Sequence, residues 1–320
     1  MSSNSQKISI IIPTKDRPQD LARCLESLSN QTLLPDEIII VDASDMEELD
    51  SSVIAKLNKK IKTTHLHTAA GLTHQKNVGV KACTGDIIFV LDDDVVLKED
   101  FVKEIVDVFD NDSERKVAGV CGRIVSTQKH DSRSLRSMLV AAIGAVHRAI
   151  AVVFLLRKRG DGTFRASGFP NYPYATSEVK RVEFLPGGLT AWRKEILSEF
   201  KFDEKLEGPS ILEDVDFSYR VSRKYVNIYT PRAELVHNPS PVARIDTIAR
   251  GKMLIENSYY LFKKNLPQTL KYKLAFYWAV VGLGLVAILY GIAGRNIELL
   301  KGLAAGLVSM KRIDKRNNQE

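Results

Sequence analysis

The sequence has few cysteines, and they are not arranged as a metal-binding motif. Cys24, Cys83 and Cys121 are its three cysteines and lie far apart in the chain. This spacing excludes a cysteine-ligated metal site and favours a reducing compartment in which the thiols fill small apolar positions. The N-terminal stretch from Met1 to Lys7 is polar, and the apolar run after it is only as long as a strand. We therefore expect no secretory signal.

A strong excess of one charge sign is also absent. The net charge of +7 is modest for 320 residues, and 44% hydrophobic and 27% charged residues are ordinary for a globular protein. We predict no nucleic-acid partner. Basic residues do follow apolar stretches, at 157–159 and 311–312, where they fit either an anionic membrane surface or a solvated basic face. No internal repeat is present, and the length suits one large domain or two small ones.

Short β-branched runs alternate with helical patterns through the N-terminal part of the chain. Strands are predicted at 8–12, 37–41, 63–68, 86–91 and 117–125, and helices from Pro18 and at 46–58, 72–82 and 99–109. At Asp16-Arg17-Pro18 a cap residue and a first-turn proline mark the helix start. This alternation predicts an α/β fold with a doubly wound, mostly parallel sheet that binds ligands beyond the carboxyl ends of its strands.

Three adjacent aspartates, Asp92, Asp93 and Asp94, end the apolar strand at 86–91. Clustered carboxylates repel one another and resist desolvation, so they do not stabilise a strand end by themselves. A divalent cation with a phosphorylated ligand makes such a cluster favourable. We predict Mg²⁺ or Mn²⁺, because the sequence places no Cys or His ligand pair nearby. Alternate residues share a side, so Asp92 and Asp94 face the ligand together.

The second half of the chain is less regular. The apolar stretch from Leu135 to Leu156 contains His147 and Arg148, which would be costly inside a bilayer, so we expect an interfacial or lid-associated helix. Further features are a loop at 160–174, a turn at Pro186-Gly187-Gly188, helices at 193–199 and 213–224, and a strand at 233–236 before His237.

Five segments, in order, resemble the family 2 glycosyltransferases, which are inverting GT-A enzymes that use nucleotide sugars. The match covers about residues 8–240. Lys76 stands where many members carry arginine, and lysine keeps the charge without the planar fork. The segments are Ile10 to Pro18, Glu37 to Asp42, Lys76 to Gly79 leading through Thr84-Gly85-Asp86 to Asp94, Pro186-Gly187-Gly188 with Arg193, and Leu212 to Asp216.

The resemblance implies a role for each matched position. The implied contacts to a nucleoside-diphosphate sugar are Pro13, Thr14, Arg17, Asp42, Lys76, Asp92 and Asp93. The implied metal ligands are Asp94, Asp92 and His237, and the implied acceptor-binding residues are Gly187 and Gly188. Trp192 is a further candidate for acceptor binding, because aromatic faces pack against the C–H surfaces of sugars. Asp214 would be the general base that takes the acceptor proton, with Glu213 beside it.

Each of these residues also has a structural explanation. The alternatives are a turn or helix cap for Asp42, a surface charge for Arg17, a structural histidine at 237, a core position for Trp192, and an acidic helix start for Glu213 and Asp214. The resemblance favours the functional roles, because the motifs occur together and in the order of the family.

The C-terminal run from Leu274 to Ala293 contains no charged residue. A helix of about 20 residues spans the hydrocarbon core, so this run predicts a membrane anchor, with a buried core helix as the alternative. The stretch at 297–310 is more charged and predicts an amphipathic interfacial helix. Because activated nucleotide sugars are made in the cytoplasm, we expect the active domain on the cytoplasmic side of the cell membrane and a lipid-linked or polysaccharide acceptor.

The expected organisation has three parts: a nucleotide-sugar-binding half at 1–125, an acceptor-binding and catalytic half at 126–265 with an insertion at about 130–180, and a membrane-associated helical tail at 266–320. Two other functions compete with a glycosyltransferase. A nucleotidyltransferase acting on sugar phosphates would carry a glycine-rich loop after the first strand, and Pro13-Thr14-Lys15-Asp16 has no glycine. A catalytically silent GT-A-like membrane scaffold is disfavoured by the presence of Asp94 and Asp214.

Overall fold

The computed structural model describes residues 6–45, 54–55, 57–125, 135–156, 162–173, 176–242, 245–294 and 297–317. The chain forms two compact units. The sheet unit comprises Met1–Thr127 and Thr176–Arg244, and the helical unit comprises Gln128–Ala175 and Ile245–Glu320. The functional division predicted at 1–125, 126–265 and 266–320 stays a prediction. The helix predicted at 46–58 lies largely outside the described residues.

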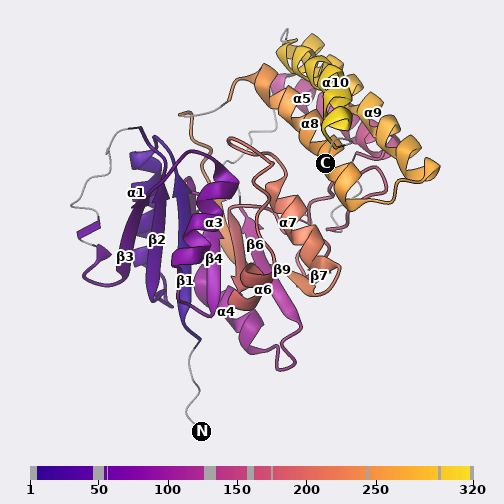
Figure 1. The fold of residues 1–320 in the computed structure, drawn as a ribbon. Helices are drawn as coiled ribbons and strands as arrows, with labels where there is room; N and C mark the ends of the chain where they lie inside the picture. Colours follow the sequence, from indigo (N-terminus) through magenta and orange to yellow (C-terminus); the bar gives the residue numbers. More distant parts are fainter. Residues whose placement is uncertain are drawn as a thin grey trace. The chain divides into compact units, whose positions relative to one another are not determined.

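One mixed sheet forms the core of the sheet unit (Figure 1). Within the described residues its order is β3-β2-β1-β4-β8-β6-β9-β5, with β7 also paired to β9. The strands are β1 Ile8–Thr14, β2 Glu37–Asp42, β3 Lys62–His67, β4 Ile87–Leu91, β5 Val95–Leu97, β6 Val117–Ile124, β7 Lys180–Val182, β8 Leu189–Arg193 and β9 Val226–His237. Strands β5, β7 and β8 run against the others, so the predicted α/β class with a mostly parallel sheet is confirmed.

The central strands explain the long apolar runs of the sequence. Every residue of β1, β2 and β4 is buried, as expected for strands covered on both faces. The parallel register sets Thr14 opposite Asp42 and Ile11 opposite Val90. The carboxyl ends of β1, β2 and β4 therefore meet at one edge of the sheet, where the predicted ligand contacts lie.

The helices of the sheet unit are α1 Pro18–Ser29, α3 Leu72–Ala82, α4 Phe101–Asp110, α6 Lys194–Glu199 and α7 Glu213–Ser222. Proline at the first position of α1 is confirmed, but no side chain caps this helix. The backbone at Asp16 is left-handed, with φ 55°, and its N–H donates to the hydroxyl of Ser44. The expected capping role at the start of α1 is therefore wrong, because the segment is bound to the loop after β2 instead.

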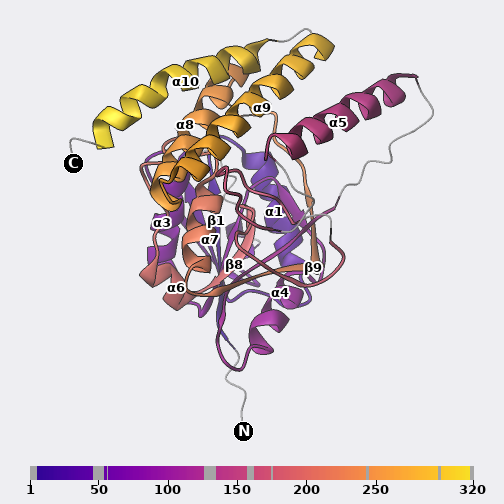
Figure 2. The same ribbon diagram turned by 90° about the vertical axis from the view of Figure 1, so that its right-hand side faces the viewer.

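The helical unit contains α5 Leu135–Val153, α8 Thr247–Asn265, α9 Leu270–Gly294 and α10 Glu298–Asn317 (Figure 2). Helices α8 and α10 pack closely, because Gly302 lies against the carbonyl oxygen of Ile248 where a Cβ would overlap with it. Among the described residues α9 is the one helix long and apolar enough to cross a membrane, and only 33% of its most apolar window is buried.

Candidate active site

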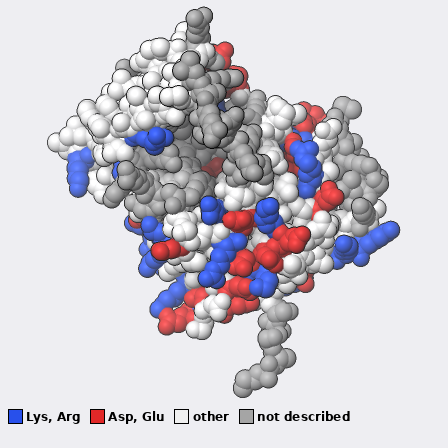
Figure 3. Space-filling model, turned by 180° about the vertical axis from the view of Figure 1, so that it is seen from behind, with Lys and Arg blue, Asp and Glu red and all other residues white. Residues whose placement is uncertain are grey.

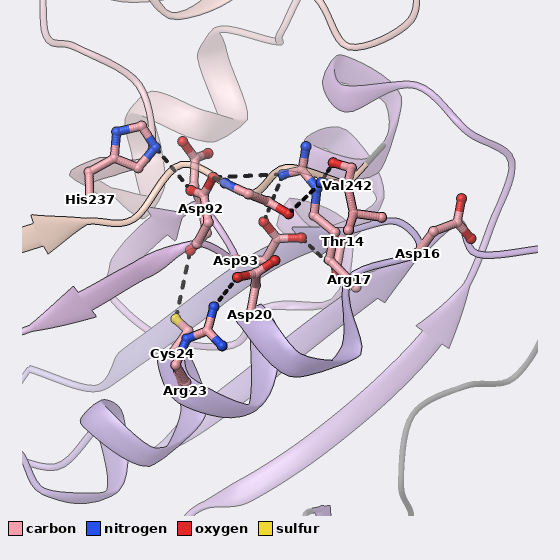
Figure 4. Close-up of polar contacts among 12 residues, drawn as sticks. Thr14, Asp16, Arg17, Asp20, Arg23, Cys24, Asp92, Asp93, His237 and Val242 are labelled. Carbon is pink, nitrogen blue, oxygen red and sulfur yellow. Dashed lines mark hydrogen bonds and ion pairs between the residues drawn. The ribbon is translucent and has the colours of Figure 1, made fainter. Parts of the chain in front are cut away.

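The three aspartates occupy the loop between β4 and β5, at the carboxyl edge of the sheet. Asp93 is 3% exposed and turns toward the end of β1. There the hydroxyl of Thr14 donates to Oδ2 at 2.7 Å, and Arg17 Nη1 lies 3.1 Å from Oδ1. Figure 4 shows Arg17 directed into this cluster and Asp16 directed away from it. Arg17 is therefore an internal counter-ion of the triplet in this structure, and not a solvated surface charge.

Asp94 belongs to a second group of contacts, formed with the end of β9. His237 Nε2 lies 3.1 Å from Asp94 Oδ1, and the backbone N–H of Ser240 donates to Oδ2 at 3.1 Å. Pairing of Val95 with His237 in the β5–β9 ladder brings the histidine to this point. The predicted triplet and the predicted histidine are thus neighbours, although they are far apart in the sequence.

The three carboxyl groups differ in acidity. Burial raises the pKa of Asp93 to about 6, although Arg17 and Thr14 act in the opposite direction. Burial also raises the pKa of Asp92, opposed by Lys76. For Asp94 burial is outweighed by hydrogen bonds from His237 and the backbone of Ser240, so its pKa is lowered. Asp94 is therefore the carboxylate best suited to stay ionised and bind a cation.

The donor atoms around Asp94 fit a hard divalent cation. No cluster of three or more His, Cys, Asp or Glu side chains suited to a metal is found within the described ranges. Mg²⁺ and Mn²⁺ need no full protein cage, since one or two carboxylates combine with substrate phosphates and water. Oδ1 of Asp94 and Nε2 of His237 lie 3.1 Å apart. Two ligand atoms of one ion, each about 2.1 Å from it, have a similar separation.

The turn Pro186-Gly187-Gly188 joins the triplet to helix α7. The N–H of Asp92 donates to the carbonyl oxygen of Gly188 at 3.1 Å, and the N–H of Gly187 donates to Oδ2 of Asp214 at 2.6 Å. Gly188 has φ +73°, and a Cβ there would overlap with the carboxylate of Asp92. Glycine is required at this position both by the backbone conformation and by the close approach of Asp92.

Helix α7 begins with three carboxylates that have different partners. Glu213 is 6% exposed and accepts from Lys76, while Asp216 is fully buried and paired with Arg220 at 2.9 Å. Asp214 is the only one of the three that is partly exposed. Desolvation of its carboxyl group, and then the negative charge of Glu213, raise the pKa of Asp214 to about 7. A partly accessible carboxylate with this pKa can accept a proton near neutral pH.

Lys76 lies on α3 and is buried, with 1% exposure. Its Nζ is 2.8 Å from Oε1 of Glu213, and it lies 5.3 Å from the ring centroid of Phe202. Burial opposes the charge, but Glu213 and Asp92 outweigh it, so the pKa of Lys76 is raised and the ammonium stays protonated. Lys76 therefore lies between the triplet and α7 and contributes positive charge to both.

Asp42 is bound locally at the end of β2. Its Oδ1 accepts from the N–H of Ser44 at 2.8 Å and from the Ser44 hydroxyl at 2.6 Å, and its Oδ2 lies 3.1 Å from Nε2 of His65. An aspartate that binds the N–H two residues ahead forms an Asx turn. Contact with a nucleoside remains a prediction.

Trp192 is 2% exposed and belongs to the core of the sheet. Its ring packs edge-on against Phe217, with centroids 4.8 Å apart, and lies where a Cβ of Gly119 would overlap with it. The indole N–H donates to Thr190 at 3.0 Å. Trp192 therefore occupies a core position, which is the structural alternative to an acceptor contact, and a contact with the acceptor stays a prediction.

Two residues that hold the site together were not predicted. Gln75 donates from Nε2 to the carbonyl oxygens of Thr14 at 2.8 Å and Val41 at 2.9 Å, so it joins the ends of β1 and β2 to α3. Ser240 supports Asp94 through its backbone alone, which no sequence pattern reveals. The position of Gln75 directly before Lys76, on a helix that faces the strand ends, is a signal that could have indicated its role.

Comparison with known proteins assigns the chain. Residues 9–197 match the family model described as glycosyl transferase family 2, which is more than half of the chain. The chain therefore belongs to glycosyl transferase family 2. The free thiols of Cys24, Cys83 and Cys121 are buried, as predicted, and Sγ of Cys24 lies 3.7 Å from the carbonyl oxygen of Asp92.

Several curated relatives are similar over parts of their length. Over 89 residues the chain is 42% identical to the uncharacterized glycosyltransferase YwdF of Bacillus subtilis, covering 28% of this chain and 32% of YwdF. It is 23% identical to the glycosyltransferase GlyG of Streptococcus pneumoniae over 57% of this chain and 61% of GlyG. It is 33% identical to the amylovoran biosynthesis glycosyltransferase AmsE of Erwinia amylovora over 30% of this chain and 37% of AmsE. The matches span less than two thirds of each relative.

Two solved structures share the fold. The mannosyltransferase PcManGT from Pyrobaculum calidifontis, in complex with GDP-Man and Mn²⁺, has a TM-score of 0.56 at 14% identity over 95% of this chain and 87% of its own. TarS of S. aureus has a TM-score of 0.50 at 14% identity over 93% of this chain and 55% of its own. At these identities the likeness concerns the fold alone, and it confirms the predicted GT-A-type architecture.

Proposed function

We propose that the chain is an inverting, metal-assisted glycosyltransferase that moves a sugar from a nucleoside-diphosphate sugar to a lipid-linked or polysaccharide acceptor at the cytoplasmic face of a membrane. The observation that carries the proposal is the Pro186-Gly187-Gly188 turn. It hydrogen-bonds to Asp92 on the donor side and to Asp214 on the acceptor side. A donor phosphate and an acceptor hydroxyl bound at these two carboxylates would be neighbours.

In the proposed reaction the acceptor oxygen attacks the anomeric carbon of the donor sugar. As this bond forms, the bond from the anomeric carbon to the diphosphate breaks, and the nucleoside diphosphate leaves with the bonding electrons. Asp214 accepts the proton of the acceptor hydroxyl, and its raised pKa of about 7 suits that transfer. Glu213 and Lys76 hold the start of α7 in place. Attack from the face opposite the leaving group inverts the anomeric configuration.

The residues suited to hold the metal are Asp94 and His237, with Asp92 next to them. Mn²⁺ or Mg²⁺, when bound, supplies positive charge that stabilises the departing diphosphate. GDP-Man and Mn²⁺ bound in the structurally similar Pyrobaculum mannosyltransferase support a donor and metal of these classes for this chain. Thr14, Arg17 and Asp42 line the same edge of the sheet and are proposed to orient the nucleoside diphosphate.

Donor turnover tests the proposal. The purified chain is incubated with UDP-, GDP- and dTDP-sugars and Mn²⁺, with and without EDTA, and the nucleotide product is identified by chromatography. We expect nucleoside diphosphate to be released from one donor class and the rate to fall on chelation and in Asp94→Asn. Formation of nucleoside triphosphate and sugar phosphate from the donor when pyrophosphate is added would identify a nucleotidyltransferase running in reverse. Absence of turnover with every donor and acceptor would leave a silent scaffold. Retention of the donor's anomeric configuration in the product would refute the inverting mechanism.

A further inference from the structure

The outward face of α9 is apolar from Leu274 to Ile292. Phe276, Ala279, Val286 and Ala287 are buried and form the inward stripe. The opposite stripe recurs every three or four residues and is 40% to 77% exposed, and it consists of Leu274, Tyr277, Val281, Leu285, Ile288 and Ile292. A surface helix of a water-soluble domain carries polar residues on its outward stripe. This face therefore fits an apolar surrounding.

Helix α5 is apolar and exposed in the same way. Arg148 is the only charged residue from Met138 to Leu156. Exposures of 48% to 63% are found for the apolar side chains Met138, Leu139, Val140, Val146, Val152 and Val153. Figure 3 shows the visible part of the helical unit, at upper left, as a largely uncharged surface with a few charged side chains near its edge.

The two helices run antiparallel and share their polar groups. His147 Nδ1 lies 3.0 Å from the hydroxyl of Tyr290, and the indole N–H of Trp278 donates to the carbonyl oxygen of Val153 at 2.9 Å. Phe154 stacks on Trp278 with centroids 4.4 Å apart. These polar groups bond to one another between the two helices, so they meet hydrocarbon at lower cost than unpaired groups would. We call the outward apolar side chains of both helices the α5/α9 face.

The connections of α5 prevent it from crossing a bilayer. Strands β6 and β7 precede and follow α5 in the chain, and both pair with β9 in one sheet, so they lie on the same side of any membrane. Between them α5 is the only helix in the described ranges, and the stretches outside those ranges are at most nine residues long. A helical span needs about 20 residues, and irregular backbone does not cross hydrocarbon. A single crossing by α5 would separate β6 from β7.

Helix α9 is held to α5 over its central part, from Trp278 to Tyr290. If α9 stood across the bilayer, it would carry α5 across with it, which the connections of α5 exclude. Exposed Lys271 and Lys273 at the start of α9, and the exposed Arg148 of α5, supply positive charge beside the apolar face. The basic side chains can pair with anionic lipid headgroups, while the apolar side chains contact the acyl chains beneath them.

We propose that the α5/α9 face lies in one leaflet of an anionic bilayer, with lipid acyl chains as its occupant, and that α9 does not cross the membrane. This deepens the proposed function, since it rests on the membrane-borne acceptor assumed there. It replaces the spanning anchor with a surface on which the enzyme meets that acceptor from one side.

The two tryptophans of the chain provide the test. Trp278 lies beside the α5/α9 face, where its indole bonds to Val153, and is 46% exposed, whereas Trp192 is 2% exposed inside the sheet unit. The full chain is added to phosphatidylcholine vesicles with a minor fraction of phosphatidylglycerol, brominated either near the headgroup end or near the methyl end of the acyl chain. We expect shallow bromines to quench the fluorescence more than deep ones, and Trp278→Phe to abolish the quenching. Equal or stronger quenching by deep bromines, or no quenching, would overturn the proposal.

A matched pair of substitutions tests the surface itself. Val281 on the α5/α9 face is 53% exposed, and Val179 in the sheet unit is 47% exposed. We expect Val281→Glu to weaken sedimentation with anionic vesicles by about tenfold, and Val179→Glu to leave it unchanged. Equal vesicle binding by both variants would overturn the proposal. If the original chain self-associates but binds no vesicles, and Val281→Glu loses this self-association, the α5/α9 face has a different occupant. Circular dichroism confirms that each variant is folded.

Catalysis is measured separately. Asp214→Asn should bind vesicles like the original chain while it loses turnover. Val281→Glu should keep its release of nucleoside diphosphate from the donor in the absence of membrane. A chain that binds vesicles but turns over no donor would refute the proposed function and leave the membrane surface intact. A chain that turns over a donor but does not bind vesicles would refute the membrane surface and leave the proposed function intact.

Discussion

Lys76 and Glu213 form a buried ion pair with 2.8 Å between Nζ and Oε1, although 137 residues separate them in the chain. Their side chains are 2% and 7% exposed. The pair connects α3, which contacts the ends of β1 and β2, to the first turn of α7, which carries Asp214. The proposed base therefore takes its position from a lysine on the donor side of the sheet.

Removal of the lysine charge should be strongly destabilising. In Lys76→Met the buried carboxylate of Glu213 loses its partner, and we expect the free energy of unfolding to fall by about 3–5 kcal/mol. Urea unfolding followed by circular dichroism measures the change. Lys103→Met is the matched control, because the Lys103–Asp107 pair is half exposed, at 50% and 45%, and should matter little. Equal midpoints for the two variants would contradict the importance of the buried pair.

The double variant Lys76→Met with Glu213→Gln separates the charge from the packing. Because both charges are removed, the unpaired carboxylate of the single variant is gone, and we expect part of the lost stability to return. A double variant less stable than Lys76→Met would show that the two residues contribute independently, and that the ion pair is not the unit of stability.

The rate of transfer should rise with pH and level off above about pH 7. Burial and the neighbouring Glu213 raise the pKa of Asp214 to about 7, and a protonated carboxyl group cannot accept the acceptor proton. Profiles of kcat/KM against pH measure this limb in the free enzyme. Asp214→Asn should lose most of the activity at every pH. A profile without a limb between about pH 5 and pH 8 would exclude Asp214 as the base.

The same carboxyl group should make stability depend on pH in the unusual direction. A raised pKa means that the native state binds the proton more tightly than the unfolded chain, in which an aspartate titrates near pH 3.9. The contribution of Asp214 to stability is therefore lost as the pH rises from about 4 through about 7. Asp214→Asn should melt at a higher temperature than the original chain above pH 7, and at a similar temperature near pH 4. The opposite order would contradict the assigned pKa.

The sequence alone predicted the helices and strands whose apolar residues form a clear pattern. The helix at Leu72–Ala82 has the predicted bounds, and β1, β2 and β4 are the apolar runs that a sheet buried on both faces requires. It did not predict β8, whose five residues Leu189–Arg193 are buried on both faces and follow a glycine turn. A strand that short has no period long enough to detect.

Contacts between distant segments could not be predicted from patterns. The adjacency of Asp94 and His237 depends on the short β5–β9 ladder, and the burial of Lys76 depends on α7. The family resemblance placed these residues in one site, but it did not indicate what each side chain contacts. For Asp42 the local alternative, a turn, could be recognised from the serine two residues ahead, because this spacing is typical of an Asx turn.

Substitution of the two glycines of the turn should have unequal effects. Gly188→Ala places a Cβ against the carboxylate of Asp92 and forces a left-handed backbone, so we expect at least a tenfold loss of turnover and a destabilisation of about 1–2 kcal/mol. At Gly187 a Cβ would lie 3.1 Å from that of Asp214, so Gly187→Ala should be milder. Gly284→Ala is the control, because nothing lies within 4 Å of its added Cβ. Turnover in Gly188→Ala equal to that of the control would refute the role of the turn.

Metal binding should depend on Asp94 and can be measured without turnover. In a thermal-shift titration with Mn²⁺ and a nucleoside diphosphate, the original chain should gain about 2.7 kcal/mol at a hundredfold excess over the dissociation constant. Asp94→Asn removes the ionised ligand beside His237, so the part of the gain that requires Mn²⁺ should disappear. Asp86→Asn is the matched control at the opposite end of β4, where the carboxylate accepts from the N–H of Lys7 at 2.9 Å. An equal response to Mn²⁺ in both variants would place the cation elsewhere, because of the two substituted residues Asp94 lies at the carboxyl edge of the sheet and Asp86 does not.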